Sequence, residues 1–227
     1  MKILALDTVS DFCSIALHIN GDVVARELLV AQAHSEQLLP MISHLLADAG
    51  ITLRELDAIA FDRGPGSFTG VRIGTSAAQA LVYAHDLPVL PVSSLSCVAQ
   101  QIFCTHPDYQ HVAVALDARI REVYWGIYEK DSQGLPQLIG SECVCAPRDT
   151  ALINKNNVFA AASGWQVYAA EFGHQLVFIS QQDPACVPIA RYLLPQAIND
   201  FRLGKTLSPD QALPVYLRDN VAEKSRV

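Results

Sequence analysis

The chain has 227 residues, of which 51% are hydrophobic and 17% are charged, and its formal net charge is −7. This composition is typical of a globular chain with one domain or two small lobes, and it excludes an intrinsically disordered one. The acidic balance argues against a protein that binds nucleic acid by itself, because such a protein normally presents a basic face.

The first half of the chain alternates apolar strands with helices. The expected elements are strands over 3–6, 14–19 and 23–30, a helix over 34–49, a strand over 58–61, a helix over 75–83, a strand at 89–90 and a helix over 94–103. The Asn20-Gly21 pair predicts a hairpin turn between the second and third strands. Gly50 is typical of the residue that ends a helix.

The second half repeats this order. It is expected to contain strands over 111–116, 122–129 and 139–144, a short helix from Pro147, a strand over 158–162, a helix over 165–172, a strand over 176–179 and a long helix over 189–203. Ala5-Leu6-Asp7 is echoed by Ala115-Leu116-Asp117, 110 residues later. Both halves therefore read βββαβαβα, which predicts a duplicated α/β fold. Its two lobes would be 1–105 and 106–227, with a cleft between them, and the closing helix, about 189–204, would pack back on the first lobe.

The run Gly64 to Gly74 follows a buried strand and opens into a helix rich in small residues. This arrangement directs free backbone N–H groups and the positive end of a helix dipole at an anion, and Arg72 could add a cation. The candidate phosphate-binding residues are Gly64, Gly66, Ser67, Thr69 and Gly70. The alternative is a glycine-rich turn that only caps a packed helix.

Two familiar phosphate loops are excluded. A P-loop requires a lysine, and no lysine occurs between Lys2 and Lys130. The dinucleotide fingerprint needs G-x-G-x-x-G, whereas Gly64, Gly66 and Gly70 are spaced G-x-G-x-x-x-G. If the fold is duplicated, Asp7 and Asp117 face each other across the cleft, where a carboxylate could hold hydrated Mg²⁺ against nucleotide phosphates. Either aspartate could instead be a residue that ends a strand.

Neither the histidines nor the cysteines have the spacing of a metal site. No two of the seven histidines are four residues apart, so no helix presents an imidazole pair on one face. The six cysteines include no C-x-x-C, although Cys143 and Cys145 would share one face of a strand. Reduced thiols in a cytoplasmic protein are the expectation. The sequence also predicts no signal peptide and no membrane-spanning run.

Five runs of residues together resemble the TsaB (YeaZ) family. They are Leu4 to Thr8, His34 to Pro40, Gly64 to Gly74, Leu116 to Tyr124 and Tyr216 to Asp219. The resemblance implies the duplicated ASKHA fold of the actin-like and Hsp70-like ATPases. It also implies a bacterial subunit needed to make N6-threonylcarbamoyladenosine (t6A) at position 37 of tRNA. In that family the transfer step belongs to the paralogue TsaD, with which TsaB pairs, and the ATPase TsaE binds the pair.

The resemblance further implies which sites this chain lacks. The catalytic paralogue holds a metal with a His-x-x-x-His pair, and this chain has none. Ala118-Arg119 follows Asp117 where ATPases of this fold use glycines. We therefore expect no tightly bound cofactor, with ATP or ADP and Mg²⁺ as candidates only at a subunit interface. The nucleotide candidates of this chain are then Asp7, Thr8, Asp117 and the phosphate-binding residues of the glycine run. We expect tRNA to be contacted only through the complex.

Two helices are candidates for the docking surface, because the family pairs through them. Their apolar or small residues are Leu38, Leu39, Ile42, Leu45, Leu46, Gly74, Ala77, Ala78 and Leu81. Internal packing explains such stripes equally well. With the family's habit, they predict an interface used for a homodimer by the isolated protein and for a TsaD-like partner in the cell. The alternative function is an autonomous actin-fold enzyme, either an ATP-dependent phosphotransferase or a glycoprotease-like peptidase.

Overall fold

The computed structural model describes residues 1–30, 33–151 and 153–218. The first lobe is built on a five-stranded sheet in the order β3-β2-β1-β4-β5. Its strands are β1 (Lys2–Asp7), β2 (Phe12–Ile19), β3 (Asp22–Leu29), β4 (Ala58–Asp62) and β5 (Val89–Val92). The first three strands are antiparallel neighbours, while β4 and β5 run parallel to β1. The Asn20-Gly21 hairpin is confirmed between β2 and β3.

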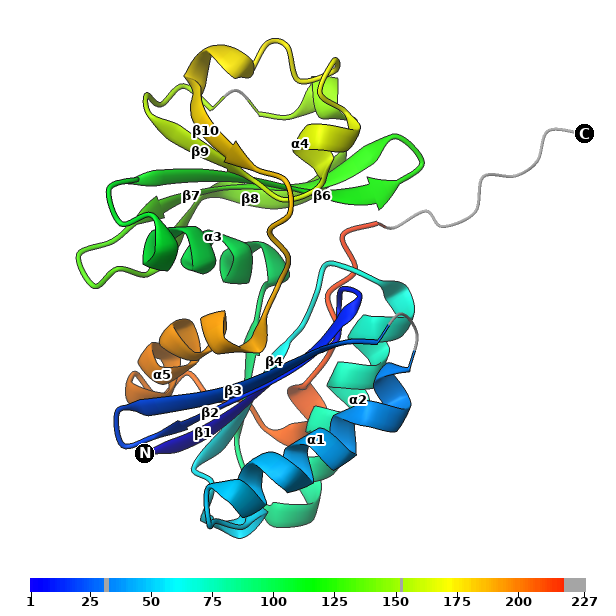
Figure 1. Cartoon of the computed structure of the whole chain (residues 1–227), viewed down its shortest axis with the longest axis vertical. Coiled ribbons are helices and arrows are strands. Elements are labelled where there is room, and N and C mark those ends of the chain that lie inside the picture. The colour runs from blue at the N-terminus through cyan, green and yellow to red at the C-terminus, as the bar shows by residue number, and fades with distance from the viewer. Residues whose placement is uncertain (31–32, 152, 219–227) are drawn as a thin grey trace, which may run out of the picture.

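The second sheet has the same order, so the predicted duplication is confirmed. Its strands are β6 (His111–Arg119), β7 (Glu122–Lys130), β8 (Pro136–Cys145), β9 (Val158–Ala161) and β10 (Ile179–Asp183), arranged as β10-β9-β6-β7-β8. In both sheets the first strand pairs antiparallel with the second and parallel with the fourth. Two stacked lobes with this strand order are the duplicated actin-like architecture (Figure 1).

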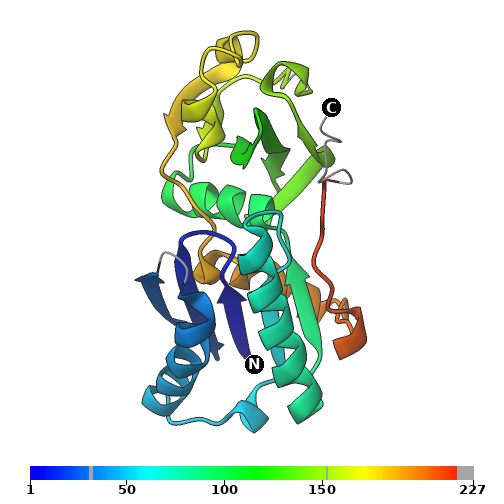
Figure 2. The same cartoon turned by 90° about the vertical axis from the view of Figure 1, so that its right-hand side faces the viewer.

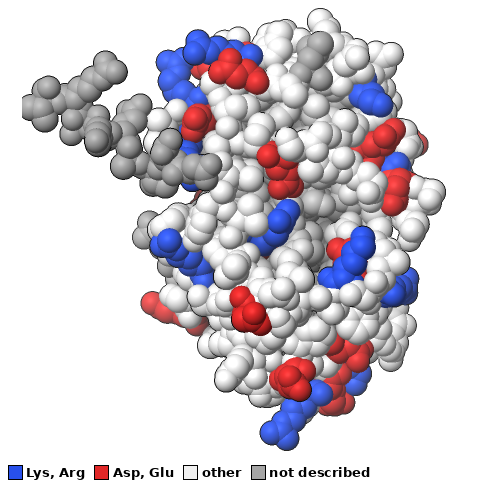
Figure 3. All heavy atoms as spheres, turned by 180° about the vertical axis from the view of Figure 1, so that it is seen from behind, with Lys and Arg blue, Asp and Glu red and all other residues white. Residues whose placement is uncertain are grey.

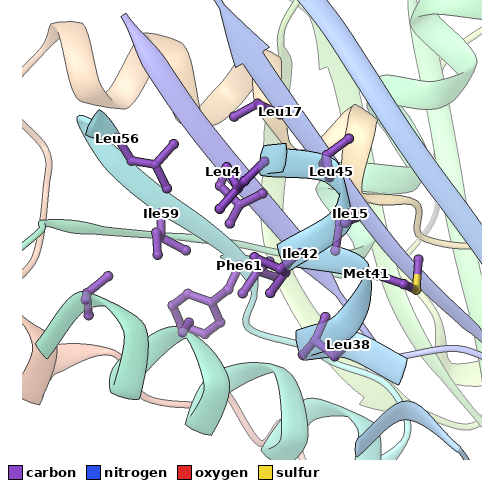
Figure 4. Packing of buried hydrophobic residues seen from close by; sticks show 14 of the residues in the cluster. Leu4, Ile15, Leu17, Leu38, Met41, Ile42, Leu45, Leu56, Ile59 and Phe61 are labelled. Atoms are coloured by element: carbon purple, nitrogen blue, oxygen red, sulfur yellow. The ribbon is translucent and has the colours of Figure 1, made fainter. Parts of the chain in front are cut away.

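Two long helices cover the outer face of the first sheet. They are α1 (His34–Asp48) and α2 (Phe68–His85), which lie side by side in Figures 1 and 2. The apolar stripe of α1 contributes to a core with β1, β2 and β4. Figure 4 shows Leu38, Ile42 and Leu45 of α1 pointing toward the sheet, on the side where Phe61 of β4 lies. These side chains are buried because the apolar stripe of the helix packs against the apolar face of the sheet.

The last helix of each repeat packs on the sheet of the other repeat. The helix α3 (Ser94–Thr105) packs against β6 and β7 of the second sheet, whereas α5 (Leu194–Arg202) packs against β1 and β5 of the first. In Figure 1 both helices lie between the two sheets. The closing helix α5 thus lies on the first sheet, and residues 94–105, at the end of the expected first lobe, contribute to the core formed with β6 and β7.

Three elements of the second lobe differ from the sequence-based expectation. The helix expected over 165–172 is only the short α4 (Gly164–Val167). Trp165, within α4, stacks on Phe172, which follows it, with ring centroids 4.3 Å apart. This aromatic packing in the core overrides local helix propensity. The strand expected over 176–179 is a 3₁₀ turn followed by β10. The long closing helix is a 3₁₀ turn followed by α5, because Pro195 fits only the first turn of a helix. Within the described residues, no helix is both long and apolar enough to cross a membrane.

Candidate functional site

The glycine run forms the predicted strand, loop and helix, but its glycines make room for the chain itself. The Ser67 hydroxyl caps α2 by accepting a hydrogen bond from the Gly70 N–H at 3.3 Å. A Cβ atom on Gly70 would lie 2.0 Å from the backbone oxygen of Thr8, and one on Gly66 would lie 2.9 Å from Val9. The Thr8 hydroxyl in turn donates to the Gly70 carbonyl at 2.7 Å.

This packing changes the interpretation of the motif. The glycines let the turn after β1 rest on the first turns of α2, where Gly74 would also collide with Thr8 if it carried a Cβ atom. The close backbone approach that the sequence suggested for a phosphate is taken by Thr8 and Val9. The geometry therefore corresponds to the second interpretation of the run, a turn that caps a packed helix. Thr69 remains exposed beside it.

Asp7 is fully buried and forms a pair with a second buried carboxyl, Asp62, which the sequence analysis did not single out. Asp7 accepts hydrogen bonds from the Val9 N–H and the Ser14 hydroxyl, at 3.0 and 2.9 Å. Burial raises the pKa of Asp7 from 3.8 to about 7. Asp62 accepts from the Gly64 N–H and the Ser94 hydroxyl, and burial together with Asp7 raises its pKa. The signal in the sequence was that both aspartates end a buried strand.

Asp117 occupies the equivalent place in the second lobe but has different surroundings. It is partly exposed and accepts hydrogen bonds from the Arg119 N–H and the Tyr168 hydroxyl, each at 2.8 Å. The guanidinium of Arg119 lies 3.2 Å from the same carboxylate. The expected arrangement, with Asp7 and Asp117 facing each other across a cleft, is corrected. Asp7 is enclosed in the first lobe, and the partners of Asp117 belong to the second.

A pocket of about 540 Å³ lies where the glycine loop, β7 and the C-terminal segment meet. Its lining residues are Pro65, Gly66, Phe68, Val71, Arg72, Tyr124, Val215, Tyr216, Leu217 and Arg218. Arg72 lies 3.5 Å above the Phe68 ring and donates to the Tyr216 hydroxyl at 2.9 Å. The sequence analysis marked Tyr216 to Asp219 only as a family motif, and Asp219 lies outside the described residues.

The C-terminal segment joins the two lobes. The Val215 N–H donates to the Arg63 carbonyl in the first lobe at 2.8 Å. Three residues later, Arg218 donates to the Ala118 carbonyl at 3.0 Å and pairs with Glu122 in the second lobe. Figure 2 shows this segment, coloured red, running along the side of the molecule from one lobe to the other.

A groove of about 480 Å³ runs between α1 and α2 on the outer face of the first lobe. Its lining residues are Ser35, Leu38, Leu39, Phe68, Thr69, Arg72, Ile73, Ser76 and Ala77. Leu39 and Phe68 are 54% and 53% exposed. The groove therefore offers apolar side chains to solvent from both helices.

Only part of the predicted interface is accessible at the surface. Six of its nine residues are buried within the lobe and cannot form a docking surface, namely Leu38, Ile42, Leu45, Leu46, Gly74 and Ala78. Leu39, Ala77 and Leu81 remain accessible. The sequence analysis missed Phe68 and Ile73, which line the same groove, because it took Phe68 for part of a phosphate loop.

Metal-ligating groups form no second site in the part of the chain that the structure describes. Among the described residues, no three side chains of the His, Cys, Asp and Glu types come together in a way that could hold a metal ion. Figure 3 shows acidic and basic side chains interspersed over the rear face of the molecule, without a single-sign patch on that face.

Comparisons with known proteins agree with the resemblance seen in the sequence. Residues 26–190 match the family model described as TsaD, tRNA N6-adenosine threonylcarbamoyltransferase. The chain is 37% identical to the tRNA threonylcarbamoyladenosine biosynthesis protein TsaB of Escherichia coli, over 99% of this chain and 97% of that protein. It is also 37% identical to TsaB of Haemophilus influenzae, over 99% and 96%. The solved structure of YeaZ from Pseudomonas aeruginosa superposes with a TM-score of 0.89 at 39% identity, covering 95% of this chain and 99% of that one.

Proposed function

Because this chain belongs to the TsaB family of tRNA threonylcarbamoyladenosine biosynthesis proteins, we propose that it is a partner subunit that performs no chemistry itself. It pairs with a TsaD-like protein, which transfers threonylcarbamoyl to position 37 of tRNA, and a TsaE-like ATPase assembles on the pair. It acts in the cytoplasm and contacts tRNA only through that complex. The runner-up, an autonomous actin-fold enzyme, would need an open site in the first lobe.

The observation that supports a partner role is the internal use of the glycine loop. Thr8 and Val9 lie against Gly66, Gly70 and Gly74, and Asp7 is fully buried beneath them. These residues hold the turn after β1 against the loop after β4 and the start of α2, and they leave no room there for a phosphate group. We propose accordingly that the isolated chain holds no cofactor tightly.

The groove between α1 and α2 is the docking surface that we propose for the TsaD-like partner. Leu39 and Phe68 expose apolar area from both helices, and Ala77 gives a helix of the partner room to approach closely. Groups of exposed apolar side chains are a liability unless a partner covers them. In the isolated protein a second copy covers the groove, which gives a homodimer with an isologous interface.

The pairing test compares a substitution in the groove with a control substitution on the surface of the second lobe. Leu39→Glu introduces a charge into the groove without touching the core, and it should abolish both the homodimer and binding to the TsaD-like partner. Val177→Glu is the matched control, because Val177 is 81% exposed in the second lobe. Sedimentation and co-purification measure pairing, and circular dichroism verifies the fold. A folded Leu39→Glu protein that still binds the TsaD-like partner would refute this docking surface.

The functional test measures t6A in cells. Depletion of this protein should lower the t6A content of bulk tRNA, quantified by mass spectrometry of nucleosides. The wild-type gene and Val177→Glu should restore it, and Leu39→Glu should not. Purified protein should show no ATP turnover at the ~1 s⁻¹ or faster of an ordinary enzyme. Turnover at that rate that Asp7→Ala abolishes would favour the autonomous enzyme instead.

A further inference from the structure

Two cysteines on β8 lie close enough to react with each other. Cys143 and Cys145 point to the same face of the strand, and their sulfur atoms are 3.7 Å apart. Both side chains are partly exposed, whereas Cys13, Cys97 and Cys186 are buried. The pair lies outside the glycine loop, the groove between α1 and α2, and the pocket beside the C-terminal segment. The proposed function gives it no role.

The two thiols share one proton in an asymmetric way. Cys143 accepts a hydrogen bond from the Cys145 thiol, which lowers the pKa of Cys143 to about 7. Cys145 gives that hydrogen bond, and nearby Asp149 and Glu122 add negative charge, so its pKa is raised. The contact between the two sulfur atoms therefore favours the thiolate form of Cys143 over that of Cys145. The thiolate is the reactive form of cysteine.

The ladder of the strand that carries the pair is interrupted immediately before Cys143. A disulfide needs its sulfurs about 2.05 Å apart, so the two atoms must approach by roughly 1.7 Å. β8 lies at the edge of its sheet and pairs only with β7. Trp125 pairs with Cys143 and Ile127 with Ile139, so β8 advances four residues while β7 advances two. Such a bulge leaves residues outside the ladder and bends the strand locally.

The residue next to the pair connects the two lobes. Glu142 accepts hydrogen bonds from the Tyr128 hydroxyl, at 2.5 Å, and from the Ser93 hydroxyl. The guanidinium of Arg63, in the loop after β4, lies 3.8 Å from the same carboxylate. Ser93 lies at the end of β5, where the chain passes from the first sheet to α3. Glu142, the neighbour of Cys143 in the chain, therefore contacts residues of both lobes.

We propose that Cys143 and Cys145 are a thiol-modification site, which hydrogen peroxide oxidises to an intrastrand disulfide that loosens the Glu142 contact between the lobes. The Cys143 thiolate attacks one peroxide oxygen and the O–O bond breaks, so that Cys143 becomes a sulfenic acid (S–O–H). The other oxygen leaves as hydroxide and takes one proton from solvent to form water. The Cys145 sulfur then attacks the Cys143 sulfur, and the hydroxide that leaves combines with the Cys145 proton as a second water. Two electrons pass from the sulfurs to the peroxide.

The bond is detected by peptide mapping of the purified full-length chain. A tryptic peptide of residues 131–148 contains both cysteines and no other. After peroxide treatment in the presence of a metal chelator, this peptide should lose two hydrogen atoms in mass and resist alkylation. Cys145→Ser should instead leave a Cys143 sulfenic acid that dimedone traps, while the control Cys104→Ser should still form the bond. A peptide that stays fully alkylatable at peroxide concentrations that oxidise the exposed Cys104 overturns the proposal.

The second readout follows the lobe contact. Oxidised wild-type protein should exchange backbone hydrogens faster around residues 88–97 than the reduced protein does, by about tenfold if one Glu142 hydrogen bond, worth roughly 1.4 kcal/mol, is lost. Cys145→Ser treated in the same way should show no change there. Equal exchange in the oxidised and reduced wild type overturns the role assigned to Glu142.

Discussion

The two lobes have the same strand order but use it differently at the turn that follows their first strand. In the first lobe this turn is enclosed. Thr8 packs onto two glycines of an 18-residue helix, and Val9 packs onto Gly66 in the loop before it. In the second lobe the corresponding turn is an exposed hairpin, and the helix that follows β9, α4, has four residues. Residues 119–121 at the tip of this hairpin all have positive φ values. The comparison shows that sheet topology persisted through a duplication while the turn chemistry diverged.

The carboxylates at these two turns show the same contrast. Asp7 is fully buried with Asp62 as its neighbour, whereas Asp117 has partial solvent access and a guanidinium partner. A buried carboxyl without a cation favours its neutral form. At this turn the first lobe therefore has a closely packed carboxyl that favours its neutral form, whereas the second lobe has a charged pair near the surface.

The largest effect should come from the close contact that only the first lobe has. Gly70→Ala places a Cβ atom 2.0 Å from the Thr8 oxygen, so we expect a loss in the free energy of unfolding of about 4 kcal/mol or more. Gly164→Ala, at 2.8 Å from the Ala115 oxygen in the second lobe, should cost less. Gly173→Ala, with its nearest atom at 3.9 Å, is the control. Urea denaturation gives the three values, and equal losses at positions 70 and 173 would contradict the packing described.

The buried carboxyl pair predicts a pH dependence of stability. Because the folded-state pKa of Asp7 is raised from 3.8 to about 7, its contribution to stability is complete below about pH 4 and is lost as the pH rises toward 7. Each pKa unit corresponds to about 1.4 kcal/mol. Asp62→Asn removes the second buried carboxyl with a raised pKa and should therefore flatten the fall in the free energy of unfolding over this interval. Asp117→Asn is the matched control in the second lobe, and an unchanged slope in Asp62→Asn would contradict the coupling of the two carboxyls.

The junction between the lobes predicts a smaller effect. Glu142→Ala leaves the Tyr128 and Ser93 hydroxyls without their acceptor, so we expect a loss of about 2 kcal/mol in the free energy of unfolding. Glu129→Ala, which removes a half-exposed carboxylate from β7, should cost much less. Urea denaturation compares the two, and similar losses would mean that the contacts of Glu142 contribute no more to stability than a half-exposed carboxylate does.

The C-terminal segment should contribute least to stability. Arg218→Ala removes a partly exposed ion pair with Glu122 and a hydrogen bond to the Ala118 carbonyl. Pairs of this kind are worth up to about 1 kcal/mol, so the Tm should fall by less than about 4 °C. Limited proteolysis should nevertheless cut after residue 211 sooner than in the wild type. Unchanged cleavage kinetics would mean that Arg218 does not fasten the segment to the second lobe.

The succession of elements along the chain and its duplication could be predicted from the sequence because they depend on local patterns. Short apolar runs, the Asn20-Gly21 turn and the echo of Asp7 in Asp117 were enough to give the two sheets. The helix expected over 165–172 failed because Trp165 and Phe172 meet Trp125 in the core, and ring packing between distant segments leaves no local signal.

The site was less predictable, because the role of each residue depends on whether its side chain faces the core, another segment or solvent. Leu39 and Leu45 belong to one apolar helix, yet Leu39 faces solvent and Leu45 is fully buried. Gly70 has the same sequence signature whether a phosphate or Thr8 approaches it. Residues such as Glu142 and Arg72 act through partners 49 and 144 positions away, and no spacing rule reveals such a pair.

The exchange of helices between the lobes sets the order in which the chain can fold during synthesis. Residues of α5, near position 200, cover the face of the first sheet that contains Ile3 and Ala5. On the ribosome, the first ninety residues must therefore wait for almost the whole protein to emerge before their core is sealed, although α1 and α2 can already pack on the opposite face. The second sheet, in contrast, finds α3 already made when its strands appear. A truncation before residue 190 should leave an aggregation-prone open sheet rather than an independent N-terminal domain.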